Sequence, residues 1–239
     1  ITKEAADIIT SRNPSSVETS TKPDGTLVTD TDLKVEMLIR SRIEEKFRSH
    51  GIIGEEYDDN IKSSPYTWII DPIDGTTSYH FGVPFFGTLV GLLKGGKPLF
   101  GSMRLPMFDQ MLAGDGSQCI INGNRCKVKK FEGFEKSLIL TTDDARMNES
   151  TYSESWNQLR KTGATFRTWG DCYGYYLLST GKADAMFDVN LKPCDILPII
   201  PIVEGAGARI VDFGKNDASD LSACVPELEE KISTDFGNH

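Results

Sequence analysis

Apolar residues recur at the spacing of an α-helix in two stretches near the start of the chain. The first stretch covers residues 4–12. The second follows capping residues at 29–32, and its apolar positions share one helical face: Val35, Leu38, Ile39, Ile43 and Phe47. The pattern predicts a short first helix and a longer amphipathic helix that begins beside Thr29.

Runs of strand-forming residues follow, separated by turn signals. A short strand is expected before Thr29, and a strand leads from Trp68 into Asp71. Asn122-Gly123 is a strong two-residue hairpin turn. Further strands are predicted at 51–54, 85–93, 98–104, 109–113 and 118–121. The first half of the chain should therefore pack helices against an antiparallel sheet.

Strands and helices alternate from Ser137 onward, which is typical of an α/β unit. One helix of about a dozen residues is expected to begin near Asp195, with Pro198 and Pro201 in its first turns. An acidic loop is expected at 143–150, and the C-terminal tail should hold a strand at 221–225 and a helix started by Pro226. The remaining predicted elements are strands at 137–142, 164–168, 183–188 and 208–212, and helices at 151–162 and 171–180.

Composition adds little to the fold but excludes several function classes. The 239 residues are 38% hydrophobic and 26% charged, as in an ordinary soluble domain. A net charge of −9 disfavours nucleic acid as a partner. Five cysteines without a C-x-x-C motif argue against a disulfide framework or a zinc site and favour a reducing, cytoplasmic location. No apolar run is long enough for a membrane span, and the start at Ile1 leaves a removed targeting segment open.

The segment Asp71-Pro72-Ile73-Asp74-Gly75-Thr76-Thr77 carries the most chemical information. Pro72 favours an extended Asp71, so the strand is expected to end at the first carboxylate and the chain to turn through the second. Thr76 and Thr77 are natural helix N-caps, behind which free N–H groups can face an anion. Two carboxylates beside such a helix start suit hard divalent cations and a phosphate. The alternative is that both acids are only turn and cap residues.

The same segment, followed by Phe81-Gly82-Val83-Pro84, resembles the signature of the inositol monophosphatase-like family, which comprises Mg-dependent, lithium-sensitive phosphatases. Further matches extend from about Lys22 to Asp212. The resemblance implies a layered αβαβα sandwich of the inositol monophosphatase/fructose-1,6-bisphosphatase type, with the metals where two halves meet. Those halves would be residues 1–135, with most metal ligands, and residues 136–239, joined in one catalytic unit.

The resemblance also assigns residues. In Gly54-Glu55-Glu56, Glu55 falls where the family binds metal and orients the attacking water. Lys22-Pro-Asp24-Gly matches a mobile active-site loop, and Asp32 matches an acid near the metals, although helix capping would also explain Asp32. Asp195 matches the ligand from the second half, with Cys194 in place of the usual aromatic. The implied metal ligands are Glu55, Asp71, the Ile73 carbonyl, Asp74 and Asp195.

This ligand set consists of oxygen atoms, which suits two or three Mg²⁺ ions, with Mn²⁺ able to substitute. The implied reaction is direct attack of a metal-activated water on a phosphate monoester. Glu55, Thr76 and Asp32 would act in catalysis, with Thr76 and Glu55 orienting or deprotonating the water. The N–H groups of Gly75, Thr76 and Thr77 would hold phosphate oxygens.

Two stretches bear on the leaving group. Trp169-Gly170-Asp171-Cys172-Tyr173 and the segment from Asp188 to Asp195 resemble the histidinol-phosphate phosphatase branch, which acts in histidine biosynthesis. Asp171 and Asp188, with Lys22, are therefore expected to bind substrate, because an amine or imidazolium would pair with the two acids. The alternative for Asp171 is N-capping of its helix.

L-Histidinol phosphate is accordingly the first expected substrate, and inositol monophosphate or a broader set of sugar phosphates is the second. A different class of function is a non-catalytic regulator of RNA or transcription, which the acidic charge and intact ligand set disfavour. The expected partner is a small phosphorylated metabolite, with neither nucleic acid nor membrane involved. Members of the family are commonly homodimers, so a homodimer is also expected.

Overall fold

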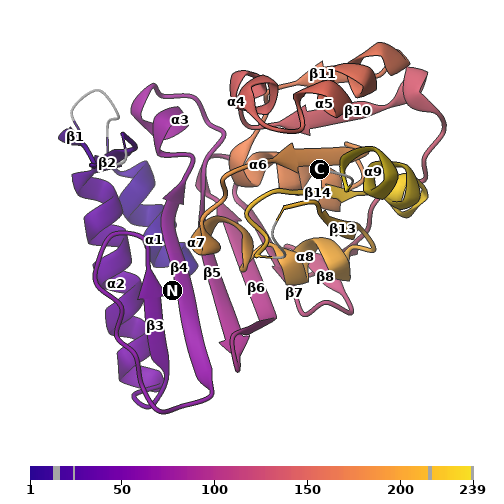
Figure 1. Ribbon diagram of the computed structural model, residues 1–239. Helices are drawn as coiled ribbons and strands as arrows, with labels where there is room; N and C mark the ends of the chain where they lie inside the picture. Colours follow the sequence, from indigo (N-terminus) through magenta and orange to yellow (C-terminus); the bar gives the residue numbers. More distant parts are fainter. Residues whose placement is uncertain (13–16, 24, 215–216, 238–239) are drawn as a thin grey trace.

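A seven-stranded sheet and a five-stranded sheet organise the computed structural model, which describes residues 1–12, 17–23, 25–214 and 217–237 (Figure 1). Asp24 of the predicted active-site loop lies outside the described residues. In the larger sheet the strands follow chain order, and only the first pair is parallel. Its strands are β3 (Gly51–Gly54), β4 (Tyr66–Asp74), β5 (Gly87–Lys94), β6 (Lys97–Leu105), β7 (Gln110–Gly114), β8 (Cys119–Ile121) and β9 (Asn124–Cys126).

The smaller sheet has the order β11-β10-β12-β14-β13. Strand β10 pairs in parallel with both neighbours, whereas β14 is antiparallel to β12 and β13. Its strands are β10 (Leu138–Thr141), β11 (Thr165–Arg167), β12 (Ala185–Asp188), β13 (Arg209–Asp212) and β14 (Leu221–Cys224). A separate hairpin joins β1 (Thr19–Thr21) to β2 (Leu27–Thr29).

The helices form three layers around the two sheets (Figure 1). Helices α1 and α2 cover the outer face of the larger sheet, α6 and α8 lie between the sheets, and α5 and α9 cover the smaller sheet. The αβαβα sandwich expected from the sequence is thus confirmed. The helices are α1 (Thr2–Thr10), α2 (Asp30–Lys46), α3 (Thr76–His80), α4 (Asp144–Glu149), α5 (Ser153–Leu159), α6 (Asp171–Ser179), α7 (Pro193–Ile196), α8 (Ile200–Gly205) and α9 (Glu229–Phe236). Short 3₁₀ turns occupy Pro106–Phe108, Phe134–Lys136, Arg160–Thr162 and Pro226–Leu228.

Hydrophobic periodicity predicted the elements that bury one face. In α2, Val35, Ile39 and Ile43 are fully buried against the larger sheet, where Ile52 and Ile70 receive them. Phe47 is wrong as a core position because it lies past the helix end and is 38% exposed. The Asn122-Gly123 turn joins β8 to β9 with both residues at positive φ, as that turn type requires.

Three local predictions are wrong. Strand β4 does not end at Asp71 but continues to Asp74. Its pairing with β5 is irregular between these two residues, so Pro72 needs no regular ladder hydrogen bond. The acidic segment 143–150 is not a loop, because Asp143 accepts a hydrogen bond from the N–H of Arg146 and caps α4. The single helix expected after Asp195 is two helices, α7 and α8, since a proline cannot continue the hydrogen-bond ladder.

A row of glycines lets α7 and α8 approach the larger sheet. Gly91, Gly101 and Gly114 are direct neighbours across β5, β6 and β7. A Cβ on Gly101 would lie 1.8 Å from the Pro198 carbonyl oxygen, and one on Gly114 would lie 2.4 Å from the Pro201 carbonyl oxygen. The strands can accommodate the backbone of α7 and α8 only because they have no side chains at these positions. This close packing brings Asp195 towards β4.

Helices from the second half therefore pack directly on the sheet of the first half. The boundary predicted near residue 135 falls in the segment that connects the two sheets, and we propose that both halves form one catalytic unit. The five cysteines are free thiols, and the Sγ atoms of Cys119 and Cys126 lie 3.1 Å apart across β8 and β9. None of the helices in the described part of the chain combines the length and hydropathy that a bilayer crossing requires.

Candidate active site

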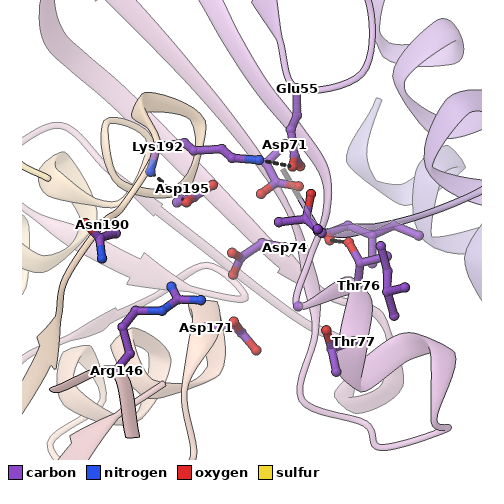
Figure 2. A pocket seen from close by; sticks show the side chains of 15 residues that line it. Glu55, Asp71, Asp74, Thr76, Thr77, Arg146, Asp171, Asn190, Lys192 and Asp195 are labelled. Carbon is purple, nitrogen blue, oxygen red and sulfur yellow. Dashed lines mark hydrogen bonds and ion pairs between the residues drawn. The ribbon is translucent and has the colours of Figure 1, made fainter. Parts of the chain in front are cut away.

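A cavity of about 600 Å³ opens where the two halves meet, and Figure 2 shows the side chains that surround it. Its walls come from the β1–β2 hairpin connection, the ends of β3 and β4, the start of α3, and the segments around α4, α6 and α7. The lining residues are Gly25, Thr26, Leu27, Glu55, Asp71, Ile73, Asp74, Gly75, Thr76, Thr77, Arg146, Asp171, Asn190, Lys192 and Asp195.

Three aspartates converge on this cavity from two elements. Asp71 and Asp74 come from β4 and Asp195 from α7, and each offers an oxygen within 4.8 Å of the others. Asp71 is 2% exposed, and its Oδ1 atom is buried without a hydrogen-bond partner among the described residues. Asp74 accepts a hydrogen bond from the N–H of Cys172, and Asp195 accepts one from the N–H of Lys192 at 2.9 Å. The arrangement leaves carboxylate oxygens aimed at a common space (Figure 2).

Glu55 lies just beyond β3 and adds a fourth carboxylate. Its Oε1 atom contacts the ammonium groups of Lys22, at 3.0 Å, and Lys192, at 3.4 Å. Lys22 also binds Glu56 at 2.8 Å. Burial alone would lower the pKa of Lys22, but the hydrogen bond with Glu56 and the charge of Glu55 outweigh burial and raise it. Two lysine ammonium groups therefore lie beside Glu55.

The electrostatics of the aspartates call for a cation. Burial raises the pKa of Asp71, and the charges of Glu55 and Asp74 raise it further. Burial likewise raises the pKa of Asp74, with added repulsion from Asp171 and Asp195. Since carboxylate and carbonyl oxygens are the ligands of hard divalent cations, an unpartnered buried Asp71 oxygen in this setting fits a metal site.

The start of α3 differs from the prediction. Its N-cap is Gly75, at φ 89°, and Thr76 is the first helical residue rather than a cap. The Thr76 hydroxyl instead donates to the Ile73 carbonyl oxygen at 3.0 Å, with the Asp32 carboxylate 3.4 Å away. A Cβ on Gly75 would lie 2.8 Å from the Phe85 carbonyl oxygen, so only glycine fits this turn. Gly75, Thr76 and Thr77 all line the cavity.

Asp32 caps helix α2 and also lies close to Thr76. It accepts a hydrogen bond from the N–H of Thr29 at 2.9 Å and so completes a capping box at the start of α2. Its other oxygen faces Thr76. Burial raises the pKa of Asp32 to about 6 despite the hydrogen bonds from Thr29. Asp32 thus lies behind Thr76 and outside the cavity wall.

The predicted substrate residues fall in three different settings. Asp171 lines the cavity; it follows the N-cap Gly170 rather than capping the helix itself, and it has a φ of 49°. Burial and then the charges of Asp188 and Asp195 raise its pKa to about 7. Asp188 and Lys22 are not among the residues that line the cavity, and substrate binding by either stays a prediction. Lys22 is occupied by the two glutamates.

Asp188 is instead a buried support for Asp171. Its carboxylate accepts hydrogen bonds from the Tyr175 hydroxyl at 2.9 Å and from the N–H of Thr142 at 3.1 Å. The Thr142 hydroxyl in turn accepts a hydrogen bond from the N–H of Asp171 at 2.9 Å. Burial raises the pKa of Asp188 to about 6. The hydrogen bonds that link Asp188 to Thr142 and Thr142 to Asp171 fix the position of the Asp171 backbone.

The cavity wall also contains residues that were not predicted as site residues, among them Arg146, Asn190 and Lys192. Arg146 is the only base in the acidic segment 143–150, a signal that the sequence does contain. Its charge lowers the pKa of Asp171, against the larger effect of burial. Lys192 could not be inferred from spacing, because its contact with Glu55 joins residues 137 positions apart.

The aspartate pKa values predict how metal and pH together affect stability. Asp171 and Asp188 have folded-state pKa values of about 7 and about 6, above the ordinary 3.8. Folding therefore favours their protonated forms, and this stabilisation is full below about pH 4 and lost as the pH rises through 7. Without divalent cations the melting temperature should thus be lower at about pH 7.5 than at about pH 5.5.

Added Mg²⁺ should raise the melting temperature more at the higher pH, because the cation competes with protons for the oxygens of Asp71 and Asp74, whose pKa values burial also raises. Thermal unfolding in EDTA and in MgCl₂, at both pH values, measures this. A magnesium-induced increase that is equal at the two pH values, or larger at the lower one, would contradict a shared carboxylate site.

Comparisons with known proteins agree with this geometry. The model of the inositol monophosphatase family matches residues 1–235. The chain belongs to the inositol monophosphatase family. It is 34% identical to the histidinol-phosphatase of Chlorobaculum parvum over 199 residues, covering 83% of this chain and 77% of that protein. It is 32% identical to inositol monophosphatase 1 of Xenopus laevis over 237 residues, covering 92% and 82% respectively.

The fold comparison reaches almost the whole chain. The crystal structure of the extragenic suppressor protein suhB from Bartonella henselae superposes with a TM-score of 0.90 at 23% identity, covering 98% of this chain and 95% of that one. The family assignment makes the chain a phosphoric monoester hydrolase. In this phosphatase of the inositol monophosphatase family, the acidic cluster in the cavity described above is a candidate metal site.

Proposed function

We propose that this phosphatase hydrolyses a small phosphate monoester with Mg²⁺ bound by Glu55, Asp71, Asp74, Asp195 and the Ile73 carbonyl. The observation that carries the proposal is the convergence of Asp71, Asp74 and Asp195 around a buried, unpartnered Asp71 oxygen. When bound, two such cations would supply a water of lowered pKa and stabilise the leaving oxygen. Mn²⁺, which accepts the same oxygen ligands, should substitute.

The chain's own groups orient the reactants. Glu55 and the Thr76 hydroxyl stand on the β3 and α3 sides of the cavity, where they can align a water and accept its proton. Asp32 positions Thr76 from behind, within 3.4 Å of its hydroxyl. The N–H groups of Gly75, Thr76 and Thr77 would bind phosphate oxygens at the start of α3. Preorganised donors of this kind act on charge that develops during the reaction.

Asp171 favours a cationic leaving group, and histidinol phosphate is the first candidate substrate. The carboxylate is more than half buried beside the cavity, so solvent would screen its attraction to an amine or imidazolium only weakly. The 34% identity to the histidinol-phosphatase of Chlorobaculum parvum supports the same choice. Arg146 favours the second candidate, inositol monophosphate, because it partly neutralises Asp171 and would repel a cation. We also propose a homodimer, as is common in the family.

Side-by-side release of phosphate from L-histidinol phosphate and from inositol 1-phosphate tests the proposal. With Mg²⁺ present, both esters should be hydrolysed, and the histidinol ester should have the higher kcat/KM. Removal of Mg²⁺ with EDTA should abolish release from both. Faster hydrolysis of inositol phosphate would reverse the order of substrates, and no hydrolysis of any monoester would refute the function.

Asp171→Asn should separate the two substrates. Asparagine tolerates the positive φ at this position, so the backbone should be kept. The loss of one charge-assisted pair should lower kcat/KM for histidinol phosphate by about 10- to 100-fold. Inositol phosphate serves as the internal control, with a change within about threefold. Equal losses for both esters would show that Asp171 supports the site without selecting the leaving group.

A further inference from the structure

Cys194 brings a sulfur atom to the edge of the carboxylate cluster. It lies in α7, directly before Asp195, and its Sγ atom is 3.3 Å from the Asp195 Oδ1 atom. Sγ also lies within 4.8 Å of carboxylate oxygens of both Glu55 and Asp71, which themselves approach within the same distance. One sulfur and two carboxylate oxygens, from three separate segments of the chain, therefore lie close enough together to bind a single ion.

Asp71, one of the three donor residues, has a buried oxygen atom that lacks a partner within the described part of the chain. Asp71 is 2% exposed, and its Oδ1 atom has no hydrogen-bond partner among the described residues. Cys194 is itself 5% exposed, so water has little access to either group. A buried acceptor without a partner is costly unless a cation or another donor completes it.

The donor set differs in kind from the oxygen ligands of the hydrolytic site. Mg²⁺ binds oxygen and gains nothing from sulfur, whereas Zn²⁺ and Cd²⁺ bind thiolates strongly. We propose that Cys194, Glu55 and Asp71 form a second cation position that takes a thiophilic divalent ion, Zn²⁺ in preference to Mg²⁺. Binding would form a sulfur–metal bond and release the thiol proton to solvent.

Charges around the position remain favourable. The three donors would carry three negative charges against two on the ion, and Asp195 lies beside them. Lys22 and Lys192 contact Glu55, and their positive charges offset this excess. Because Glu55 and Asp71 belong to both positions, an ion held by Cys194 would compete with Mg²⁺. Zn²⁺ should therefore bind in place of the ion used for hydrolysis.

The inference shares two ligands with the proposed function but requires no hydrolysis, so a binding measurement can test it separately. The test starts from a Cys119→Ser/Cys126→Ser background, since those two sulfurs are 3.1 Å apart and could bind the same ions. Co²⁺ serves as the spectroscopic probe. The background protein should show a thiolate-to-cobalt charge-transfer band that Zn²⁺ abolishes, and Cys194→Ser should remove it.

Affinity gives the quantitative comparison. Cys194→Ser should weaken Zn²⁺ binding by about tenfold or more and change the Mg²⁺-induced thermal shift little, because only the soft ligand is lost. Failure of Mg²⁺ to shift the background protein would count against the proposed function and leave the cobalt result to decide this inference. A cobalt band that persists in Cys194→Ser, or that is absent from the background, would overturn it.

A second measurement needs no change at Cys194. Zinc-edge X-ray absorption of the Zn²⁺-loaded background protein should show one sulfur at about 2.3 Å among oxygen ligands. Because Cys172 and Cys224 remain in this protein, the folded Cys194→Ser variant serves as the control. Its spectrum should show only oxygen and nitrogen ligands. An oxygen-and-nitrogen shell in the background protein itself would refute the sulfur ligand.

Discussion

Glu55→Gln is expected to reduce kcat by about 10²- to 10⁴-fold, the range found when a group that orients and deprotonates a nucleophile is lost. The amide keeps the size of the side chain and can still accept a hydrogen bond from Lys22 or Lys192. It removes the negative charge that would bind a cation and accept a proton. Steady-state phosphate release at saturating Mg²⁺ measures the effect, with circular dichroism to show that the fold is kept.

Glu56→Gln is the matched control. Glu56 neighbours Glu55 and binds the same Lys22 ammonium at 2.8 Å, but it does not line the cavity. Burial raises its pKa to about 7, against the hydrogen bond from Lys22, so the neutral form costs little at this position. Turnover should fall by less than about tenfold. Near-normal turnover of Glu55→Gln, or an equal loss in both variants, would remove Glu55 from the mechanism.

Gly101→Ala should lower the free energy of unfolding by about 3 kcal/mol, the upper part of the usual range for overpacking. The added Cβ would lie 1.8 Å from the Pro198 carbonyl oxygen, which is backbone and cannot rotate away. Either the strand or the α7–α8 connection must move. Because α7 carries Asp195, the midpoint of activation by Mg²⁺ should rise as well. Urea unfolding and magnesium titration measure the two effects.

Ser102→Ala controls for a change on the same strand. Ser102 follows Gly101 and points to the opposite face, where its hydroxyl donates to the Val90 carbonyl oxygen at 3.1 Å. Its loss should cost about 1 kcal/mol and leave the Mg²⁺ midpoint unchanged. If Gly101→Ala were no less stable than Ser102→Ala, the glycine row would not be what allows α7 and α8 to approach the sheet.

The sequence predicted most elements because each buries a repeating apolar face. Helix α2 shows this, since Val35, Ile39 and Ile43 follow helical spacing and are all buried. The two boundaries around the central segment failed for tertiary reasons. Strand β4 continues past Pro72 because its irregular pairing with β5 does not require a proline N–H group. Gly75, not Thr76, is the N-cap of α3, and the Thr76 hydroxyl donates to the Ile73 carbonyl oxygen.

The candidate site was predicted in part. Asp71, Asp74 and Asp195 converge as the family resemblance implied, and their roles as ligands stay predictions. Asp171 lines the cavity and Asp188 does not. Asp188 accepts a hydrogen bond from Tyr175, a contact between two elements that sequence spacing does not reveal. The contact between Lys192 and Glu55 likewise follows from long-range packing.

The glycine row illustrates the same limit. Gly91, Gly101 and Gly114 are separated in sequence by ten and thirteen positions, and nothing in the chain marks them as neighbours. Strand register brings them together, and the backbone of α7 and α8 then fills the space that they leave. Their shared role, which is to leave space for the backbone of α7 and α8, follows only from the packing of these helices on the sheet.

Anomalous diffraction from crystals soaked in Mn²⁺ tests the central claim most directly. The account predicts two peaks about 3.5–4 Å apart in the cavity, one beside Asp71, Asp74 and Asp195 and the other beside Asp71 and Glu55. Both should weaken when excess Mg²⁺ is added. An empty cavity at saturating Mn²⁺, with these carboxylates turned away from one another, would contradict it.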